Sequence, residues 1–336
     1  MNKPPLVSVL ITPYNQKDYI RQTLDSILMQ KTQFDFEVVI GEDCSTDGTR
    51  EICQEYAQAY PQQIVLCLNE RNKGFINNYF DVFLKAKGVY IADCGGDDYW
   101  LTETKLQEQV DLLEAHQEVS LVAGNWQLYD QKRNLLRQSD SWIHQDWFQP
   151  EGFGEKAVAN YLNLNDIPRI VLAASCFRGD WAREAYHNNP DLFRGQDVVC
   201  EDLPLTMGLL MKGPFFISKN NWLVYRVLEK SLSHSPNQDE YLKGFAFSAF
   251  KQTVCLVAKL GIPMSAIQSY LLDKIGEFVV HTVLKEDIDF SSRLQAFCKE
   301  QRINVGLKSR ILFYCLKQPL LSKCLRAFYR KRYKHA

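Results

Sequence analysis

The first half of the chain alternates short apolar runs with segments in which apolar residues recur at helical spacing. The runs have the length of single strands and lie at residues 6–12, 36–41, 64–68 and 89–93. Near-continuous apolar runs are typical of strands that are covered on both faces of a parallel sheet. Strands that alternate with helices at short spacing form right-handed βαβ units. The sequence therefore predicts an α/β fold built on a doubly wound sheet.

The second half of the chain is less regular. An apolar run at residues 170–177 predicts a further strand. Before it, residues 131–166 are polar and aromatic, and a long irregular insertion of this kind is often a lid or an acceptor-binding loop. The last hundred residues have a helical pattern. We expect one domain over residues 1–237 and a helical region over residues 238–336.

Composition narrows the class of protein. The formal net charge of −1 argues against nucleic acid as the main partner. The ten cysteines form no CxxC pair and no zinc-type cluster, so we expect reduced thiols in a cytoplasmic protein. The N-terminal residues lack the pattern of a signal peptide, and no apolar segment is long enough to span a bilayer.

Two adjacent carboxylates follow the fourth predicted strand. Asp97 and Asp98 come after the break at Gly95-Gly96 and before two large aromatic residues. Open α/β sheets bind ligands at the carboxyl ends of their strands, and carboxylate oxygens there suit Mg²⁺ or Mn²⁺ on a diphosphate. An Asx-rich turn that caps the next helix is the alternative interpretation.

Four separated motifs occur in an order that defines a resemblance. They are Thr12-Pro13-Tyr14-Asn15, Glu42-Asp43-Cys44-Ser45-Thr46-Asp47-Gly48-Thr49, Gly96-Asp97-Asp98-Tyr99-Trp100 and Glu201-Asp202. Together they resemble family 2 glycosyltransferases of the GT-A fold, over roughly residues 5–235. The resemblance implies a Rossmann-like, doubly wound mixed sheet with a helical C-terminal appendage, a nucleotide-sugar donor, and transfer with inversion at the anomeric carbon.

The donor nucleotide needs hydrogen-bond partners at the end of the second strand. An acid there can accept from a uracil imide or a ribose hydroxyl, and we assign this role to Asp43, with Glu42 second. Asp47 fits better as a helix-capping acid. Thr12 and Asn15 either contact the nucleoside or only close the first turn.

The metal motif of the family, Asp-x-Asp, aligns with Gly95-Gly96-Asp97, so its first acid is missing. Asp97 becomes the candidate ligand for Mn²⁺ or Mg²⁺, and Asp98 a partner of the ligand shell or of a sugar hydroxyl. Asp93 points to the same face as residue 95 in an extended strand and could compensate. Mg²⁺ often takes only one or two protein carboxylates, so the missing acid affects metal affinity more than it affects the fold.

Sugar transfer also needs a base for the acceptor hydroxyl. The resemblance places it at the Glu201-Asp202 pair, which directly starts an apolar helix, with Asp202 as the base and Glu201 as its neighbour. An N-terminal helix cap is the alternative interpretation of Asp202. Asp191 and Asp197 lie close by in the sequence.

Several other residues keep two interpretations. Tyr99 and Trp100 are either packing residues or platforms for a sugar ring. His234 either approaches the phosphates or lies in a solvated turn. Lys73 either reaches the nucleotide or is simply exposed.

The C-terminal tail is basic and apolar together. No acid follows Glu300, whereas the tail contains Lys308, Arg310, Lys317, Lys323, Arg326, Arg330, Lys331, Arg332 and Lys334 among large apolar residues. This composition favours an interfacial helix on an anionic membrane, which would place the protein on the inner face of the cytoplasmic membrane. A helix packed on the catalytic domain is the alternative.

We therefore expect a glycosyltransferase that moves a sugar, with UDP favoured as the nucleotide, to a hydroxyl of a glycan or lipid-linked acceptor in lipopolysaccharide, capsule or exopolysaccharide assembly. A nucleotidyltransferase is disfavoured because no glycine-rich, basic phosphate loop follows the first strand. A non-catalytic nucleotide-sugar-binding protein with a degenerate metal site is the second hypothesis.

Overall fold

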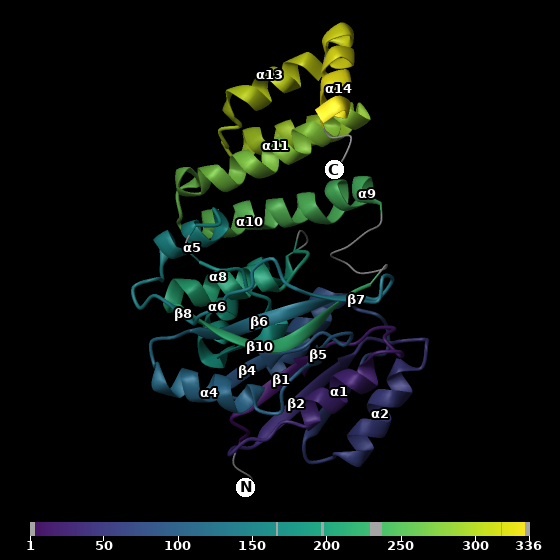
Figure 1. The fold of residues 1–336 in the computed structure, drawn as a ribbon, viewed down its shortest axis with the longest axis vertical. Coiled ribbons are helices and arrows are strands. Elements are labelled where there is room, and N and C mark those ends of the chain that lie inside the picture. The colour runs from purple at the N-terminus through teal and green to yellow at the C-terminus, as the bar shows by residue number, and fades with distance from the viewer. Residues whose placement is uncertain (1–3, 166, 196–197, 229–236, 317, 333–336) are drawn as a thin grey trace.

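A mixed sheet runs through the N-terminal two thirds of the chain (Figure 1). The computed structural model describes residues 4–165, 167–195, 198–228, 237–316 and 318–332. Within these residues the strand order is β3-β2-β1-β4-β9-β6-β10-β5, with β7 paired to β6 and β8 paired to β10. The strands are β1 (Val7–Ile11), β2 (Phe36–Glu42), β3 (Ile64–Leu68), β4 (Tyr90–Asp93), β5 (Tyr99–Trp100), β6 (Leu121–Asp130), β7 (Leu135–Gln138), β8 (Trp147–Phe148), β9 (Ser175–Arg178) and β10 (Phe215–Val227).

Helices cover both faces of this sheet. The helices that alternate with strands are α1 (Ile20–Leu28), α2 (Thr49–Ala59), α3 (Phe75–Lys85), α4 (Lys105–Ala115), α5 (Glu155–Leu162), α6 (Gly179–Asn188), α7 (Asp191–Arg194) and α8 (Asp202–Lys212). The C-terminal helices are α9 (Gln238–Tyr241), η2 (Leu242–Ala246), α10 (Phe247–Lys259), α11 (Gln268–Lys285), α12 (Ile288–Glu300), α13 (Gly306–Leu316) and α14 (Pro319–Arg332), with short 3₁₀ turns at η1 (Leu172–Ala174) and η3 (Met264–Ile267).

The predicted doubly wound sheet is confirmed. Strand β1 pairs in parallel with β2 on one side and with β4 on the other, and β2 pairs in parallel with β3. The carboxyl ends of β1, β2 and β4 therefore meet at one edge of the sheet. The strand order reverses between β1 and β4, which is where open α/β sheets bind their ligands.

Two hydrophobic cores lie on opposite faces of the sheet. One is filled by α1, α2 and α4, through residues such as Leu24, Ile52 and Leu113. The other is filled by α3, α5, α6 and α8, and it continues without a break into the C-terminal helices. Figure 1 shows these helices stacked beyond α6 and α8, with α13 and α14 farthest from the sheet.

Aromatic side chains hold the C-terminal helices together. Phe247 of α10 lies 5.7 Å from Phe278 of α11 and 5.2 Å from Phe290 of α12, ring centre to ring centre, in edge-to-face geometry. Such pairs add to the stabilisation from burial. The helical C-terminal region is confirmed, and the division at residues 237 and 238 stays a prediction.

Two sequence predictions about the middle of the chain need correction. Residues 131–166 are not irregular throughout: they contain β7, β8 and α5, and both strands extend the sheet by antiparallel pairing. The apolar run at 170–177 is not one strand, because it folds into η1 and then β9. Strand β9 runs antiparallel between β4 and β6 and is fully buried, so its apolar pattern resembles that of a parallel strand.

All ten cysteines are free thiols. Among the residues that the structure describes, no helix combines the length and apolar character needed to cross a membrane.

Candidate functional site

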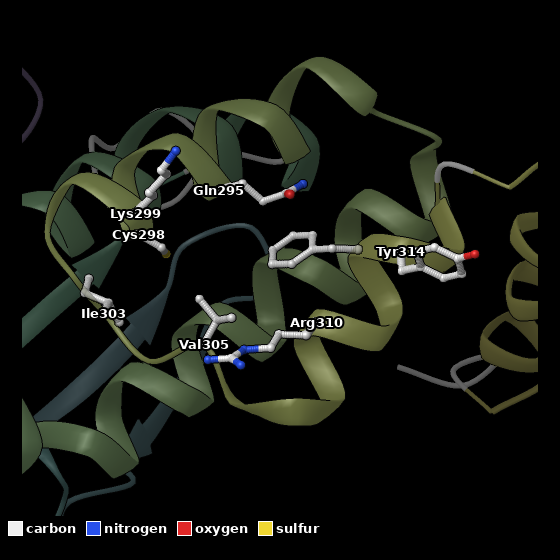
Figure 2. Close-up of a pocket in the computed structure, with 8 residues that line it drawn as sticks. Gln295, Cys298, Lys299, Ile303, Val305, Arg310 and Tyr314 are labelled. Carbon is white, nitrogen blue, oxygen red and sulfur yellow. The ribbon is translucent and has the colours of Figure 1, made fainter.

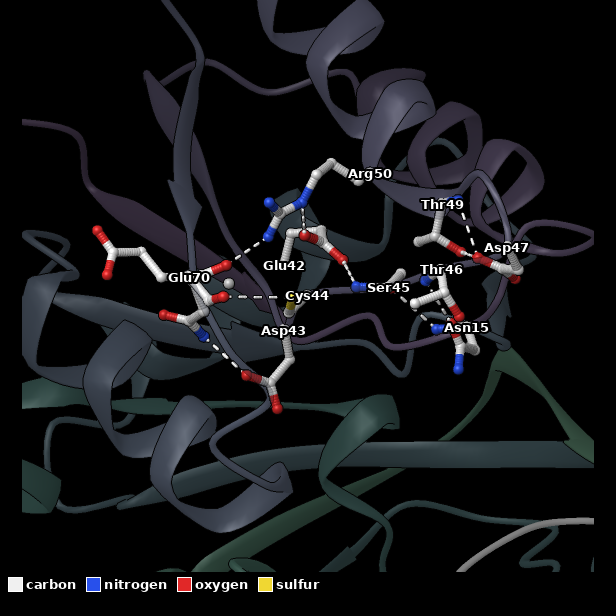
Figure 3. Close-up of polar contacts among 12 residues, drawn as sticks. Asn15, Glu42, Asp43, Cys44, Ser45, Thr46, Asp47, Thr49, Arg50 and Glu70 are labelled. Carbon is white, nitrogen blue, oxygen red and sulfur yellow. Dashed lines mark hydrogen bonds and ion pairs between the residues drawn. The ribbon is translucent and has the colours of Figure 1, made fainter.

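The turns after β1 and β2 are bound to each other. The backbone amide of Asn15 donates to the Ser45 hydroxyl at 3.0 Å, and the Asn15 side-chain oxygen accepts from the amide of Thr46 at 2.9 Å (Figure 3). Asp47 accepts from the amides of Lys17 and Thr49, both at 3.0 Å. These hydrogen bonds join both turns into one wall at the edge of the sheet. The contact of Asp47 with the Thr49 amide is an Asx turn that leads into α2, whereas the residue at the N-cap of this helix is Gly48.

The acids at the end of β2 are buried and engaged by the protein itself. Glu42 pairs with Arg50 and accepts from the amide of Ser45 at 2.7 Å (Figure 3). Asp43 is 2% exposed and accepts from the amides of Lys73 at 2.9 Å and Gly74 at 3.0 Å. The Asp43 carboxylate therefore fixes the loop that leads into α3. Its assignment to the nucleotide stays a prediction, as does that of Glu42.

The loop after β4 is held by α1 and β10. The hydroxyl of Thr23 donates to the carbonyl oxygen of Asp98 at 2.6 Å. The backbone amide of Arg226 donates to Oδ1 of Asp98 at 2.8 Å, and the guanidinium of Arg226 donates to the carbonyl oxygen of Asp97. The guanidinium also lies between two aromatic rings, 5.2 Å from the centre of Tyr19 and 4.8 Å from that of Tyr99. Because the Arg226 guanidinium makes both hydrogen bonds and aromatic contacts, it restricts the movement of the loop that carries Asp97 and Asp98.

The carboxylates of this loop differ in their surroundings. Asp98 is buried, and its burial beside Asp97 raises its pKa well above the usual range. Asp97 is half-buried, and burial raises its pKa while the charge of Arg226 lowers it. A Cβ added at Gly95 would lie 3.0 Å from Oδ2 of Asp98 and 3.1 Å from Oδ1 of Asp97. The position of the missing acid of the family motif therefore adjoins both carboxylates.

A second group of acids lies beneath this loop. Burial raises the pKa of Asp93 to about 7, and the hydroxyl of Tyr79 opposes that rise. Burial and the charges of Asp202 and Asp93 raise the pKa of Glu201 well above its usual range. The pKa of Asp202 is also raised by burial, but a hydrogen bond from Glu201 lowers it. Because the two buried carboxyls interact and both pKa values are raised, they titrate as a pair that takes up a proton more readily than exposed acids do.

The structure brings Asp93 and the predicted base together, although 108 positions separate Asp93 from Glu201 in the sequence. Glu201 is the residue that immediately precedes α8, and its side chain makes no capping hydrogen bond to the helix. The pair at the start of α8 is therefore turned toward the carboxyl end of β4. This arrangement places the predicted base on the same edge of the sheet as Asp97 and Asp98.

A buried lysine lies under the same edge. Lys105 is 0% exposed, its ammonium donates to Oε1 of Gln109 at 2.8 Å, and it lies 3.9 Å from the centre of the Trp100 ring. Burial lowers its pKa to about 8, whereas the charge of Asp93 acts in the opposite direction. Lys105 supplies positive charge behind the acids, and Trp100 is a packing residue that is 1% exposed.

The remaining candidates are placed as follows. Thr12 is half-buried at the end of β1, and Lys73 pairs with Asp81 through its ammonium at 2.8 Å. Asp191 is exposed at the start of α7. The predictions for His234 and Asp197 lie outside the described residues.

Asp97 and Asp98 fit a metal ion that takes most of its ligands from the phosphate groups of a bound substrate and from water. No group of three or more His, Cys, Asp or Glu side chains within the described ranges is arranged to hold a metal. Asp97, however, offers a half-buried carboxylate, and Oδ2 of Asp98 is not the oxygen that the Arg226 amide engages. One or two carboxylates suffice for Mg²⁺ when phosphate and water complete its shell.

Sequence reasoning missed three buried residues near the acids. Arg226 of β10, Tyr79 of α3 and Lys105 of α4 are each at most 7% exposed. A charged residue beside the apolar run of β10 needs a charged or polar partner, and that was the available signal for Arg226. Lys105 gave no such signal, because α4 contains several other charged and polar residues. Tyr79 gave no such signal because a tyrosine packs well in a core.

A mixed sheet with acids after β2 and after β4 and with an acid pair at the start of α8 defines a protein of the GT-A fold. Residues 8–171, slightly less than half of the chain, match the model of the family "Glycosyl transferase family 2", and this segment belongs to that family. An uncharacterized protein of Mycobacterium tuberculosis is 44% identical over 115 residues, which are 34% of this chain and 33% of that protein.

A second relative has a specific name. The "UDP-Glc:alpha-D-GlcNAc-diphosphoundecaprenol beta-1,3-glucosyltransferase WfaP" of Escherichia coli is 38% identical over 109 residues, which are 32% of this chain and 41% of that protein. The chain thus spans less than half of the length of these relatives. Among solved structures, S. aureus TarS 1-349 in complex with UDP-GlcNAc has a TM-score of 0.67 at 15% identity, covering 98% of this chain and 91% of that one. This likeness extends over the helical region and concerns the fold.

Proposed function

We propose that this chain is an inverting glycosyltransferase that moves a sugar from a UDP-sugar to a hydroxyl of a glycan or lipid-linked acceptor during assembly of a bacterial surface polysaccharide. The observation that carries the proposal is the meeting of two acid groups at one edge of the sheet, Asp97-Asp98 after β4 and Glu201-Asp202 at α8, with Asp93 beside the second. The name of the Escherichia coli relative, which specifies a UDP-sugar donor and a lipid-linked sugar acceptor, supports the substrate classes.

The donor lies against the wall formed by the turns after β1 and β2. Asp43, Glu42, Thr12 and Asn15 line this side, and Asp43 keeps the loop at Gly74 in place through its two backbone hydrogen bonds. The diphosphate lies toward Asp97 and Asp98. A divalent cation held there, Mn²⁺ or Mg²⁺, would neutralise the charge that builds on the leaving diphosphate.

Asp202 takes the proton of the acceptor hydroxyl. The acceptor oxygen forms a bond to the anomeric carbon while the bond from that carbon to the diphosphate oxygen breaks. The nucleoside diphosphate leaves with the electron pair, and attack from the opposite side inverts the configuration. Because Glu201 holds its own proton and donates to Asp202, it keeps the charge on the base where it is needed.

We infer that the acceptor enters through a groove between the start of α3 and the helical region. The groove has a volume of about 420 Å³ and is lined by residues from the start of α3, from residues 198–199 and from the π-helical turn η2. Its aromatic walls, Phe75 and Phe245, suit the apolar faces of sugar rings, and Ser248 and Asn77 offer hydrogen bonds. Val199, on the wall of this groove, lies three positions before Asp202 in the sequence.

The test is release of nucleoside diphosphate from UDP-, GDP- and dTDP-sugars, with Mn²⁺, Mg²⁺ or a chelator and a set of glycan acceptors. The native chain is compared with Asp97→Asn and Asp202→Asn, and with Asp191→Asn as an exposed control acid. Metal-dependent release from one donor, lost in the first two variants only, is the expected result. If a donor stabilises the chain but no turnover occurs under any of these conditions, the proposed enzymatic function is contradicted. The result would then favour a nucleotide-sugar-binding protein.

A further inference from the structure

The α13 helix presents an apolar strip to solvent. Leu307, Ile311 and Tyr314 are 74%, 52% and 63% exposed. They follow one another at spacings of four and three residues, so they lie on one face of the helix. Exposed large apolar residues are common singly, but three in register on one helix form a surface that another apolar phase can cover.

The opposite face of α13 is already used. Leu312, Phe313 and Leu316 are between 5% and 8% exposed and belong to the hydrophobic core. The apolar residues of the tail are therefore divided between internal packing and an outward strip. Because the helix packs on α11 and α14 and also offers a second apolar face, the two sequence interpretations of the tail are compatible.

Positive charge surrounds the strip. Lys308 and Arg310 are exposed on α13, and Lys323 is exposed on α14 together with Leu321 and Phe328. Arg326 is paired with Glu286, but no acid follows Glu300 in the sequence, so the helices α13 and α14 bring no negative charge of their own. An apolar strip together with exposed cations matches an anionic lipid surface, with cations at the headgroups and apolar residues at the acyl boundary.

We propose that the exposed face of α13, continued by α14, docks on the surface of an anionic bilayer. A second copy of this chain is a poorer fit, because a two-fold contact through this face would bring cations against cations. This proposal rests on the exposed residues of α13 and α14 and holds whether or not the chain transfers a sugar.

A cavity beside the strip deepens the apolar surface. It has a volume of about 470 Å³ and lies between α12 and α13, where Ile303, Val305 and Phe313 form apolar walls (Figure 2). Arg310 and Tyr314 border it as well. Arg310 and Tyr314 therefore belong to the outward face of α13 and also to the edge of this cavity, which can accept part of an acyl chain.

The experiment is co-sedimentation of the full chain with vesicles of phosphatidylcholine alone, or of phosphatidylcholine and phosphatidylglycerol in equal parts. We expect binding to the anionic vesicles only, and loss of that binding as salt concentration rises. Replacing Lys308 and Lys323 by Glu lowers the partition coefficient by about fivefold or more per residue. Ile311→Gln with Tyr314→Gln also lowers it, while leaving the thermal unfolding temperature unchanged because both side chains are exposed.

The matched control is Leu84→Gln with Lys87→Glu, which changes an exposed apolar residue and an exposed lysine near α3. It should bind anionic vesicles like the native chain. Equal binding to neutral and anionic vesicles, or equal losses in the control and in the α13 variants, would overturn the proposal. A concentration-dependent dimer that the α13 variants abolish would assign the face to self-association instead.

Discussion

The side-chain amide of Gln252 in α10 binds both backbone groups around Cys200, two residues before the predicted base. Its Oε1 accepts from the amide of Val199 at 3.1 Å, and its Nε2 donates to the carbonyl oxygen of Cys200 at 2.8 Å. Gln252 is 5% exposed. The helical region thus fixes the segment that leads into Glu201 and Asp202.

Gln252→Leu should lower kcat for sugar transfer about tenfold or more while leaving donor KM within about twofold, because the base loses its position but the nucleotide wall does not. Steady-state kinetics with varied donor measure this split. Gln268→Leu, which removes a hydrogen bond to Asn304 far from the acids, is the control and should leave both constants unchanged. A rise in KM alone would contradict the positioning role.

The two acids at α8 should respond differently to neutralisation. Asp202→Asn removes the group that takes the acceptor proton and should lower kcat by about 10² to 10⁴, with donor binding retained. Glu201→Gln keeps a hydrogen-bond donor toward Asp202, so its loss should be much smaller. Turnover assays and calorimetric donor binding distinguish them. If Glu201→Gln were the more damaging change, the roles of the two residues would be reversed.

Arg226→Met should loosen the loop that carries Asp97 and Asp98. The substitution removes the hydrogen bonds of a nearly buried guanidinium and its contacts with Tyr19 and Tyr99. We expect a loss of about 2 to 4 kcal/mol in the free energy of unfolding and a weaker response of activity to Mn²⁺. Denaturant unfolding and a metal titration of activity test both. Arg133→Met, at an exposed pair with Asp130, should do neither.

The lowered pKa of Lys105 predicts that the free energy of unfolding depends on pH. Its pKa is lowered to about 8 in the folded chain and is about 10.4 in the unfolded chain, so between these values the unfolded chain binds one proton more. Stability of the native chain should therefore rise with pH in this window by up to about 1.4 kcal/mol per pH unit, relative to Lys105→Met. Denaturant unfolding of both proteins at pH 7.5, 8.5 and 9.5, values chosen to span roughly this window, gives the difference. A constant difference would show that Lys105 stays protonated.

Two glycines should respond in opposite directions to alanine. At Gly41 in β2, a Cβ would lie 2.4 Å from Cγ2 of Val82 and 2.6 Å from Oδ1 of Asn78, both buried in α3. Gly41→Ala should cost about 1 to 3 kcal/mol by overpacking. Gly276, inside α11, has nothing within 4 Å of an added Cβ, and Gly276→Ala should stabilise by about 0.5 to 1 kcal/mol. Thermal unfolding measures both; a loss at Gly276 would contradict the packing described for α11.

The strands of the first hundred residues could be predicted closely because each is a continuous apolar run between turn residues. The predicted runs at 6–12, 36–41 and 64–68 correspond to β1, β2 and β3. Strand β9 could not be predicted in length or direction, because a fully buried antiparallel strand has the same pattern as a parallel one. The short strands β7 and β8 form through pairing with distant strands rather than through local preference.

The candidate site also contains residues that a local sequence pattern indicates and residues that it does not. Asp97, Asp98, Glu201 and Asp202 could be proposed as candidates from the sequence because each follows or begins a regular element, and their roles stay predictions. The contacts of Arg226 with Asp97 and of Gln252 with Cys200 join residues 129 and 52 positions apart, and no local pattern encodes them. Long-range partners of this kind decide whether an acid is charged, and they required the structure.

The placement of β9 and β10 has a consequence for how this chain can be divided. Strand β9 separates β4 from β6, and β10 provides the parallel neighbour of β6 and the partner of β5. Both strands lie beyond residue 171, where the match to the family ends. A fragment cut there would expose the edges of β4 and β6, which attract other chains. The recognisable family segment is thus not an autonomous folding unit, and exchange of this segment between relatives would succeed only if these two later strands moved with it.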